Sequence, residues 1–230
     1  MSLILAESAL ETLPPETWRH PLVIKQSKKR GIHPGSILLD RSYHHKVMEL
    51  IDRPEKRGRP DIVHFALLEA LGSPLNREGL LRVYVHTIAD KVINIRPETR
   101  LPRNYVRFTS LIEQLFNLGS VPPEGESLLW VEDKKLSDLI REISPSRVTA
   151  FSSAGKPCTI RVVVTCLRDI EHPAIVIGGF PHGSFSEEAK LLFDEVYRID
   201  REVLDAFIVV SRVIYEYETL LSISEKRLKL

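Results

Sequence analysis

Apolar and polar positions alternate along the chain in blocks, and the period of each block predicts a strand or a helix. Short apolar runs of strand length recur from the start of the chain to its last third. Between most of them lie segments with helical spacing, which predicts an α/β fold: a largely parallel sheet with helices on both faces. The expected strands are residues 3–6, 80–87, 91–95, 127–132, 147–151, 158–166, 174–179 and 195–199.

One part of the chain departs from this simple alternation. Residues 80–87 and 91–95 are two β-rich runs separated by three residues, which predicts a hairpin. The helix after it, which Thr99 can cap, carries apolar residues with the spacing of a buried stripe from Phe108 to Phe116. The other expected helices are residues 16–29, 43–51, 61–71, 136–143 and 204–220.

Composition narrows the class of protein. The chain has 230 residues, 27% charged and 43% hydrophobic, which is ordinary for a globular protein with a full core. No apolar run approaches the ~20 residues of a membrane span, and the first residues lack the pattern of a signal peptide. The two cysteines, Cys158 and Cys166, are too few for a disulfide framework and suit a reducing compartment. We therefore expect a cytoplasmic protein with no membrane partner.

Three of the expected strands end in small or polar residues. Residues 174–177 are followed by Gly178 and Gly179, residues 147–151 by a Ser-Ser-Ala-Gly run, and residues 195–199 by an acidic stretch. The carboxyl ends of parallel strands are where α/β proteins usually bind ligands, so one hypothesis is a binding site there. Plain tight turns are the alternative, because the chain has neither a Gly-x-Gly-x-x-Gly motif nor a P-loop lysine.

Arg59 and Asp61 stand at the entrance of the helix at residues 61–71. They either pair with each other and favour the helix dipole, or both face a substrate. His44 and His45 are adjacent, and neighbours on a helix point in different directions, so we expect no shared metal ion there.

A group of arginines precedes the stripe at residues 108–116. The net charge is only +1, so a polyanion partner would need a local basic patch. If the helical register reaches back, Arg100, Arg103 and Arg107 gather on one side, where guanidinium groups suit phosphates. Tyr105 or Phe108 could then stack on an unpaired base. Ordinary surface arginines paired with nearby carboxylates are the alternative.

Motifs spread over the whole chain resemble one family. They are R-P-D-I-V-H at 59–64 with S-P-L-N at 73–76, R-L-P-R-N-Y-V-R-F at 100–108, G-G-F-P-H-G at 178–183 and V-V-S-R-V-I-Y at 209–215. In this order they resemble the SPOUT-class N1-specific pseudouridine methyltransferases of small-subunit ribosomal RNA, which act in ribosome biogenesis. The chain has no long basic extension at either end, so the resemblance is to a compact, archaeal-type member.

The resemblance implies a single SPOUT methyltransferase domain over residues 1–230, with a family-specific extension at about 77–120. It also implies a trefoil knot in the part from about 145 to 220, where three loops hold S-adenosylmethionine mainly through main-chain groups. No metal is expected. The cofactor-binding residues it implies are Phe151, Ser152, Gly155, Gly178, Gly179, Phe180, Gly183, Ile199, Leu204 and Ala206.

The implied reaction is transfer of a methyl group to nitrogen 1 of a pseudouridine that has been turned out of its helix or loop. Asp61 is the candidate base or orienting group, and Arg59 would bind the base or a phosphate. A clamp that only holds the helix entrance is the alternative role for this pair. The RNA-binding residues that the resemblance implies are Arg59, Arg100, Arg103 and Arg107.

The resemblance further implies small-subunit ribosomal RNA as a partner, a homodimer with its sites near the interface, and other ribosome-assembly proteins as candidate partners. The apolar faces of the helices at 108–116 and 204–220 could serve the dimer or the core of one chain. One rival hypothesis is a non-catalytic RNA-binding ribosome-assembly chaperone, which would keep the arginine face and not need the three loops. Another is a SPOUT enzyme for a different target, such as a ribose hydroxyl or a transfer-RNA guanine.

Overall fold

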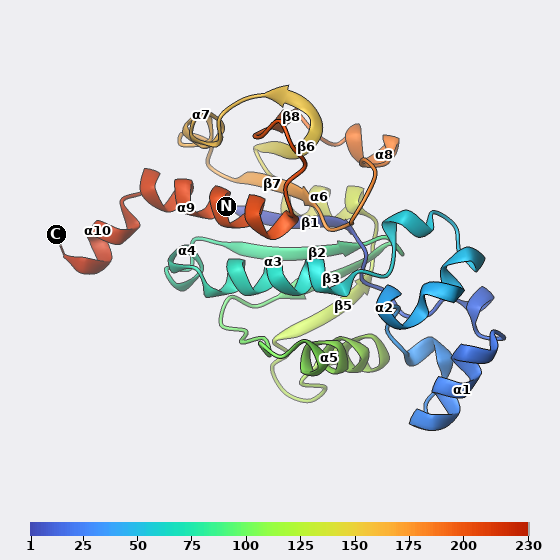
Figure 1. Ribbon diagram of the computed structural model, residues 1–230. Helices are drawn as coiled ribbons and strands as arrows, with labels where there is room; N and C mark the ends of the chain where they lie inside the picture. The colour runs from blue at the N-terminus through green and yellow to red at the C-terminus, as the bar shows by residue number, and fades with distance from the viewer. Residues whose placement is uncertain (230) are drawn as a thin grey trace.

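The computed structural model describes residues 1–229 and contains an eight-stranded sheet of order β4-β5-β3-β2-β1-β7-β6-β8 (Figure 1). The strands from β8 to β2 run parallel, and β3, β5 and β4 continue the sheet antiparallel. The largely parallel sheet and the hairpin of β2 and β3 are therefore confirmed. The strands are β1 Ser2–Ser8, β2 Arg82–Thr87, β3 Lys91–Ile95, β4 Ser120–Val121, β5 Leu129–Asp133, β6 Arg147–Pro157, β7 Pro173–Gly178 and β8 Glu195–Arg198.

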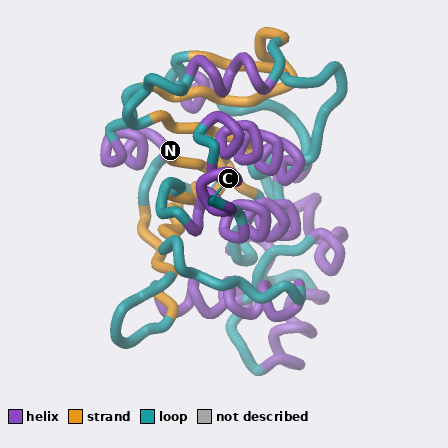
Figure 2. The backbone as a smooth tube through the Cα atoms, turned by 90° about the vertical axis from the view of Figure 1, so that its left-hand side faces the viewer, coloured by secondary structure: helices purple, strands orange, loops and turns teal. Residues whose placement is uncertain are grey.

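Helices cover both faces of this sheet, as predicted. The helices α3, α5, α7 and α9 pack on one face, and α6 and α8 pack on the other. Figure 2 shows several helices stacked side by side next to the strands. The helices are α1 Pro21–Arg30, α2 Arg41–His44, α3 Pro60–Gly72, α4 Pro74–Arg77, α5 Tyr105–Leu118, α6 Leu136–Ile143, α7 Ile160–Cys166, α8 Glu187–Lys190, α9 Ala206–Leu220 and α10 Ile223–Leu228.

The central strands are apolar throughout because both of their faces are buried. In β1, Leu3 and Leu5 point into the core under α3 and α9, and Ile4 and Ala6 point into the core under α6 and α8. Successive side chains of a strand alternate between faces, so a strand covered on both sides reads as a continuous apolar run.

The segment between β1 and α3 forms a small layer of its own, with a separate cluster of buried side chains that includes Leu13, Val23 and Val47. It lies beyond the carboxyl end of β1 (Figure 1). Here two predicted helices are wrong in extent. The expected helix at 16–29 is a 3-10 turn followed by α1, because His20 caps a new start at Pro21. The one at 43–51 is the short α2 and a 3-10 helix at 45–50.

The expected strand at 158–166 is wrong, since residues 160–166 form the helix α7. Its run of valines suggested a strand by β propensity, but Thr159 caps a helix there through Val162 N–H. Val163 and Val164 are buried while Val162 is 52% exposed, as in an amphipathic helix.

The preceding strand β6 is longer than predicted and includes the Ser-Ser-Ala-Gly run. This run is therefore a bend within a strand and not a loop.

The helix α5 starts at Tyr105, where Asn104 accepts a hydrogen bond from Arg107 N–H. Thr99 instead donates its hydroxyl to the carbonyl of Leu128. The helical register therefore does not reach back to Arg100 and Arg103, and the expectation that it aligns the three arginines is wrong.

The apolar faces of α5 and α9 belong to the core of this chain. Phe108, Ile112 and Leu115 of α5 are buried in the same cluster as Val210 and Val213 of α9. These side chains are therefore used for packing within one chain. Among residues 1–229, no helix is long and apolar enough to cross a membrane.

Candidate functional site

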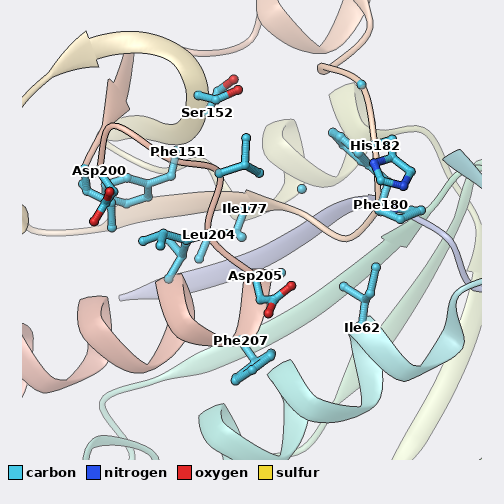
Figure 3. A pocket seen from close by; sticks show the side chains of 18 of the residues that line it. Ile62, Phe151, Ser152, Ile177, Phe180, His182, Asp200, Leu204, Asp205 and Phe207 are labelled. Atoms are coloured by element: carbon cyan, nitrogen blue, oxygen red, sulfur yellow. The ribbon is translucent and has the colours of Figure 1, made fainter. Parts of the chain in front are cut away.

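A cavity of about 630 Å³ opens at the bend in the middle of β6 and at the carboxyl ends of β7 and β8. The first turns of α3 and α9 close it from the other side (Figure 3). In Figure 3, Phe151, Ile177 and Leu204 lie together on one wall, and Ile62 and Phe207 come from the two helices. The volume lies within the range of about 300–1,000 Å³ that is common for small-molecule sites.

The three segments that the sequence singled out meet at this cavity. They are the bend in β6, the segment after β7 and the segment between β8 and α9. Most of the predicted cofactor-binding residues line it, on all three segments. These residues are Phe151, Ser152, Gly178, Phe180, Gly183, Ile199, Leu204 and Ala206.

Gly155 and Gly179 are the two predicted residues that the structure does not place in the cavity lining. Both allow two backbones to approach. A Cβ at Gly155 would lie 2.5 Å from the carbonyl carbon of Tyr197, so glycine lets β6 lie against β8. A Cβ at Gly179 would overlap the side chain of Ser8. The small residues therefore serve two purposes, since some line the cavity and others allow close packing of the backbone.

Sequence reasoning missed several lining residues. Ile62 and Phe65 of α3 carried only the signal of an apolar helix face, although Phe65 is 47% exposed at the cavity. Tyr197, at the end of β8, was not separable from an ordinary strand residue. Burial, together with the neighbouring Glu195, raises the pKa of Tyr197 to about 12, so its hydroxyl stays protonated and can donate a hydrogen bond. The other missed lining residues outside the three expected loops, 151–155, 178–183 and 199–206, are Ile177, Phe185, Arg198, Phe207 and Val209. Within those loops, the lining also includes Ser153, Pro181, His182, Asp200, Glu202, Val203 and Asp205.

Acidic groups outnumber basic ones around the cavity. Such a balance attracts a cationic ligand more than a polyanion. The charged lining residues are Arg59, Arg198, Asp61, Asp200, Glu202 and Asp205.

Arg59 and Asp61 form a two-pronged ion pair at the start of α3, on the edge of the cavity. Arg59 Nε lies 2.8 Å from Asp61 Oδ1, and Nη2 lies 2.7 Å from Oδ2. Arg59 and Asp61 therefore pair with each other, as one of the two alternatives expected, and both also line the cavity. Hydrogen bonding to Asp61 raises the pKa of the Arg59 guanidinium further above its usual range.

The segment after β7 is fixed at both of its ends. Gly179 N–H donates to Ala6 O at 2.9 Å, and Gly179 O accepts from Ala9 N–H at 2.8 Å. At the other end, the buried carboxylate of Glu7 accepts from Ser186 N–H at 2.9 Å. These bonds fix the two ends of the segment whose residues line the cavity.

A buried ion pair supports the middle of the same segment. Lys56 Nζ lies 2.9 Å from Glu7 Oε2 and 4.4 Å from the centre of the Phe180 ring. Burial favours the neutral form of the Glu7 carboxyl, but the hydrogen bonds from Ser186 and Lys56 outweigh it and lower its pKa. Glu7 has a left-handed backbone with φ of 49°, and it lies at an irregularity between Leu5 and Ser8 in the pairing of β1 with β2.

Arg100, Arg103 and Arg107 lie outside the cavity lining and are exposed. Within the part of the chain that the structure describes, none of the three forms an ion pair, so the alternative of surface pairs with carboxylates does not apply to them. Phe108 is fully buried, so the expectation that it stacks on a base is wrong. Tyr105 is half-buried and donates its hydroxyl to Asp40 at 2.5 Å.

The histidine pair shows no metal-binding geometry. The His44 ring accepts from Asp40 N–H and bonds to Gln26 Oε1, while His45 is exposed. No group of three or more potential metal ligands is found among residues 1–229.

Comparisons with known proteins assign the family. The model of the family described as EMG1/NEP1 methyltransferase matches residues 3–218. A protein of Staphylothermus marinus named "Ribosomal RNA small subunit methyltransferase Nep1" is 44% identical over 224 residues, which cover 97% of each chain. A protein of the same name from Thermococcus kodakarensis is 44% identical over 223 residues, 97% of this chain and 100% of its own length.

A solved structure agrees with this assignment. The crystal structure of Archaeoglobus fulgidus Nep1 bound to S-adenosylhomocysteine matches with a TM-score of 0.84 and 37% identity, and it covers 96% of this chain and 98% of that one. The match of both sequence and fold extends over nearly the whole length. The chain therefore belongs to the EMG1/NEP1 methyltransferase family.

Proposed function

We propose that this protein methylates nitrogen 1 of a pseudouridine in small-subunit ribosomal RNA, with S-adenosylmethionine as the methyl donor. The observation that carries the proposal is the cavity where three sheet-end segments meet beside the Arg59–Asp61 pair. Relatives that are named small-subunit ribosomal RNA methyltransferases, and a solved relative bound to S-adenosylhomocysteine, support the choice of substrate and donor.

The residues of the cavity fit the donor. Phe151, Ile177 and Leu204 form an apolar wall suited to an adenine ring, and Ser152 and Asp200 offer polar groups for ribose hydroxyls. The excess of carboxylates suits a cation. When bound, S-adenosylmethionine supplies an electrophilic methyl group on a positively charged sulfur.

The target atom makes the reaction selective by its chemistry. Nitrogen 1 of pseudouridine carries a proton, whereas the same nitrogen of uridine is bonded to its sugar. In the proposed step, nitrogen 1 forms a bond to the methyl carbon, the carbon–sulfur bond breaks with its electrons on sulfur, and the nitrogen loses its proton. The base must leave its stack to reach the cavity.

Asp61 and Arg59 are the groups placed to orient that base. The guanidinium fixes both carboxylate oxygens, and each oxygen keeps a lone pair for a further donor such as the N–H of the base. We assign Asp61 as the acceptor or orienting group for this proton and Arg59 as its support and a contact to the RNA. The exposed Arg100, Arg103 and Arg107 would bind the phosphates outside the cavity.

The proposal includes a homodimer and a knotted cofactor part at about 145–220 within one methyltransferase domain. Since the apolar faces of α5 and α9 are used internally, the interface would draw on exposed apolar residues, such as Val203 at the cavity with 80% exposure and Val162 of α7 with 52% exposure. Other assembly proteins are further candidate partners. A protein that acts on assembling small subunits would work in the cytoplasm.

A non-catalytic RNA-binding assembly chaperone is the second candidate, and the unpaired arginines outside the cavity favour it as much as they favour the enzyme. The two differ in their use of the cavity. Calorimetric titration with S-adenosylhomocysteine, followed by transfer of tritium-labelled methyl groups to a small-subunit RNA transcript with and without pseudouridine, separates them. Donor-product binding with pseudouridine-dependent transfer supports the enzyme, and RNA binding with neither supports the chaperone.

A further inference from the structure

His64 belongs to the R-P-D-I-V-H motif, yet the proposed reaction does not use it. It is fully buried in α3, and its ring is stacked on Phe108 of α5, with ring centres 4.2 Å apart and an angle of 17° between the rings. Its Nε2 lies 2.7 Å from the carbonyl oxygen of Pro102. A carbonyl can only accept, so Nε2 carries the proton and donates this bond.

The other ring nitrogen shows why this bond matters. With Nε2 protonated, Nδ1 is a bare acceptor, and it is buried without a hydrogen-bond partner among the described residues. A phenylalanine would stack on Phe108 as well and would place no unpaired ring nitrogen in the core, but it would not bond to Pro102. The hydrogen bond to Pro102 is therefore the contribution that distinguishes histidine at this position.

Pro102 lies in the segment that carries two of the free arginines. Residues 96–104, between β3 and α5, have no regular secondary structure. The hydroxyl of Thr99 holds the start of the segment to Leu128 at 3.1 Å. For residues 100–103, the bond from His64 is the one hydrogen bond found within the described part of the chain. Arg100 and Arg103 flank this anchored carbonyl, and both are exposed.

The same helix reaches the cavity. Asp61, Ile62 and Phe65 of α3 line it, while His64 faces α5. Figure 1 shows α3 lying between α9 and α5. One rigid helix thus contacts the proposed methyl-transfer cavity on one side and the arginine segment on the other.

We propose that His64 is a positioning residue that holds the segment of Arg100 and Arg103 in the place from which these arginines bind RNA phosphates. The inference rests on the proposed function, since it assumes RNA as the ligand. His64 itself touches neither RNA nor methyl donor. Its loss should weaken RNA binding and leave donor binding intact.

The test compares two substitutions. His64→Phe keeps the stack and removes the donor, and His64→Gln keeps an N–H donor of similar reach. The affinity for a ribosomal RNA hairpin is measured over a range of salt concentrations, and the affinity for S-adenosylhomocysteine is measured in parallel. We expect His64→Phe to lower RNA affinity about tenfold at low salt and to reduce the salt slope by up to about 1.4, the value for two phosphate contacts to a single strand. His64→Gln should restore both quantities, with S-adenosylhomocysteine affinity unchanged in either variant.

A double-variant cycle locates the effect. In Arg100→Ala/Arg103→Ala protein, adding His64→Phe should change neither RNA affinity nor salt slope further. If His64→Phe does not fold, His64→Met serves as the second donor-free variant. Unchanged RNA affinity and salt slope in the donor-free variant overturn the inference, as does an equal loss of S-adenosylhomocysteine affinity. Wild-type protein that binds no RNA overturns the proposed function first, and the role of His64 with it.

Discussion

The guanidinium of Arg59 donates two hydrogen bonds, of 2.8 and 2.7 Å, to the carboxylate of Asp61. This pair lies at the start of α3, on the edge of the cavity. Because Pro60 fixes the helix start between them, the pair is set by local geometry. The same pair can serve the reaction and hold the helix entrance, and these two roles have different consequences on substitution.

Asp61→Asn should abolish most turnover while the protein stays folded. The ion pair is partly exposed, with side-chain exposures of 41% and 29%, and such pairs contribute at most about 1 kcal/mol to stability. A positioned proton acceptor is worth about a hundredfold or more in rate. Single-turnover methyl transfer at saturating RNA and donor should fall by that factor, with both affinities nearly unchanged.

Asp138→Asn is the matched control for this experiment, because Asp138 pairs with Arg141 on the surface of α6, away from the cavity. It should leave the rate unchanged. If Asp61→Asn instead lowers the melting temperature or prevents dimer formation as much as it lowers the rate, the pair acts only as a clamp.

Glu7→Gln should destabilise the protein strongly at neutral pH. The substitution leaves the charge of Lys56 buried without its partner, since the side chain of Glu7 is only 9% exposed and that of Lys56 only 8%. Breaking a buried ion pair costs about 3–5 kcal/mol. Denaturant unfolding at pH 7 measures this cost. Glu187→Gln, which removes an 85% exposed partner of Lys190, is the control and should change stability by less than about 0.5 kcal/mol.

The same pair predicts the response to acid. The pKa of Glu7 is lowered below its ordinary value of 4.5, so the stability from the charged carboxylate is complete above that pH. It is lost as the pH falls through the lower folded-state pKa. The stability difference between wild type and Glu7→Gln should therefore shrink as the pH is lowered. A difference that stays constant down to acid unfolding would show that Glu7 acts through packing and not through its charge.

Gly179→Ala should disturb the segment after β7, because a Cβ there overlaps Ser8. The hydrogen bonds of Gly179 to Ala6 and Ala9 fix that segment, so both thermal stability and S-adenosylhomocysteine affinity should fall. Gly72→Ala at the end of α3 has open space around its Cβ and should be neutral or stabilise by up to about 1 kcal/mol. Equal behaviour of the two alanine variants would contradict this account of the segment.

Arg100→Ala, Arg103→Ala and Arg107→Ala should each weaken binding of a ribosomal RNA hairpin without changing S-adenosylhomocysteine affinity. Each lost phosphate contact should reduce the salt slope by about 0.7 for a single strand. The control is Arg141→Ala on the opposite face of the sheet, which should leave the slope as it is. A change in slope for Arg141→Ala equal to that of the three variants would mean that RNA binding is not confined to this face.

The sheet was predictable because its signal is local. The apolar run from Leu3 to Ala6 predicted a strand, and in the structure Ile4 and Leu5 of this strand enter opposite cores. The hairpin of β2 and β3 followed from two β-rich runs with a short break. Errors arose where a local signal had two meanings. The valines of α7 have strand propensity, but Thr159 caps a helix; Thr99 could cap α5, but Asn104 does so.

The lining of the cavity was predictable where glycines and strand ends marked it, and it was not predictable where it depends on tertiary packing. Gly178 lines the cavity and Gly179 does not, a distinction that depends on Ser8 from a distant part of the chain. The sequence around Phe108 did not show that its ring is unavailable for stacking on a base, because the ring is buried against His64 of α3, which is distant in the sequence. The buried pair of Glu7 and Lys56 joins residues 49 positions apart, and no spacing rule relates them.

The central claim is tested most directly with two RNA hairpins that differ only in one loop nucleotide, pseudouridine in one and uridine in the other. Each is incubated with the full chain and S-adenosylmethionine, digested to nucleosides and examined by mass spectrometry with fragmentation. The account predicts one added methyl group on the base of pseudouridine and none on the uridine hairpin. Equal methylation of both hairpins, or a methyl group on the ribose, would contradict it.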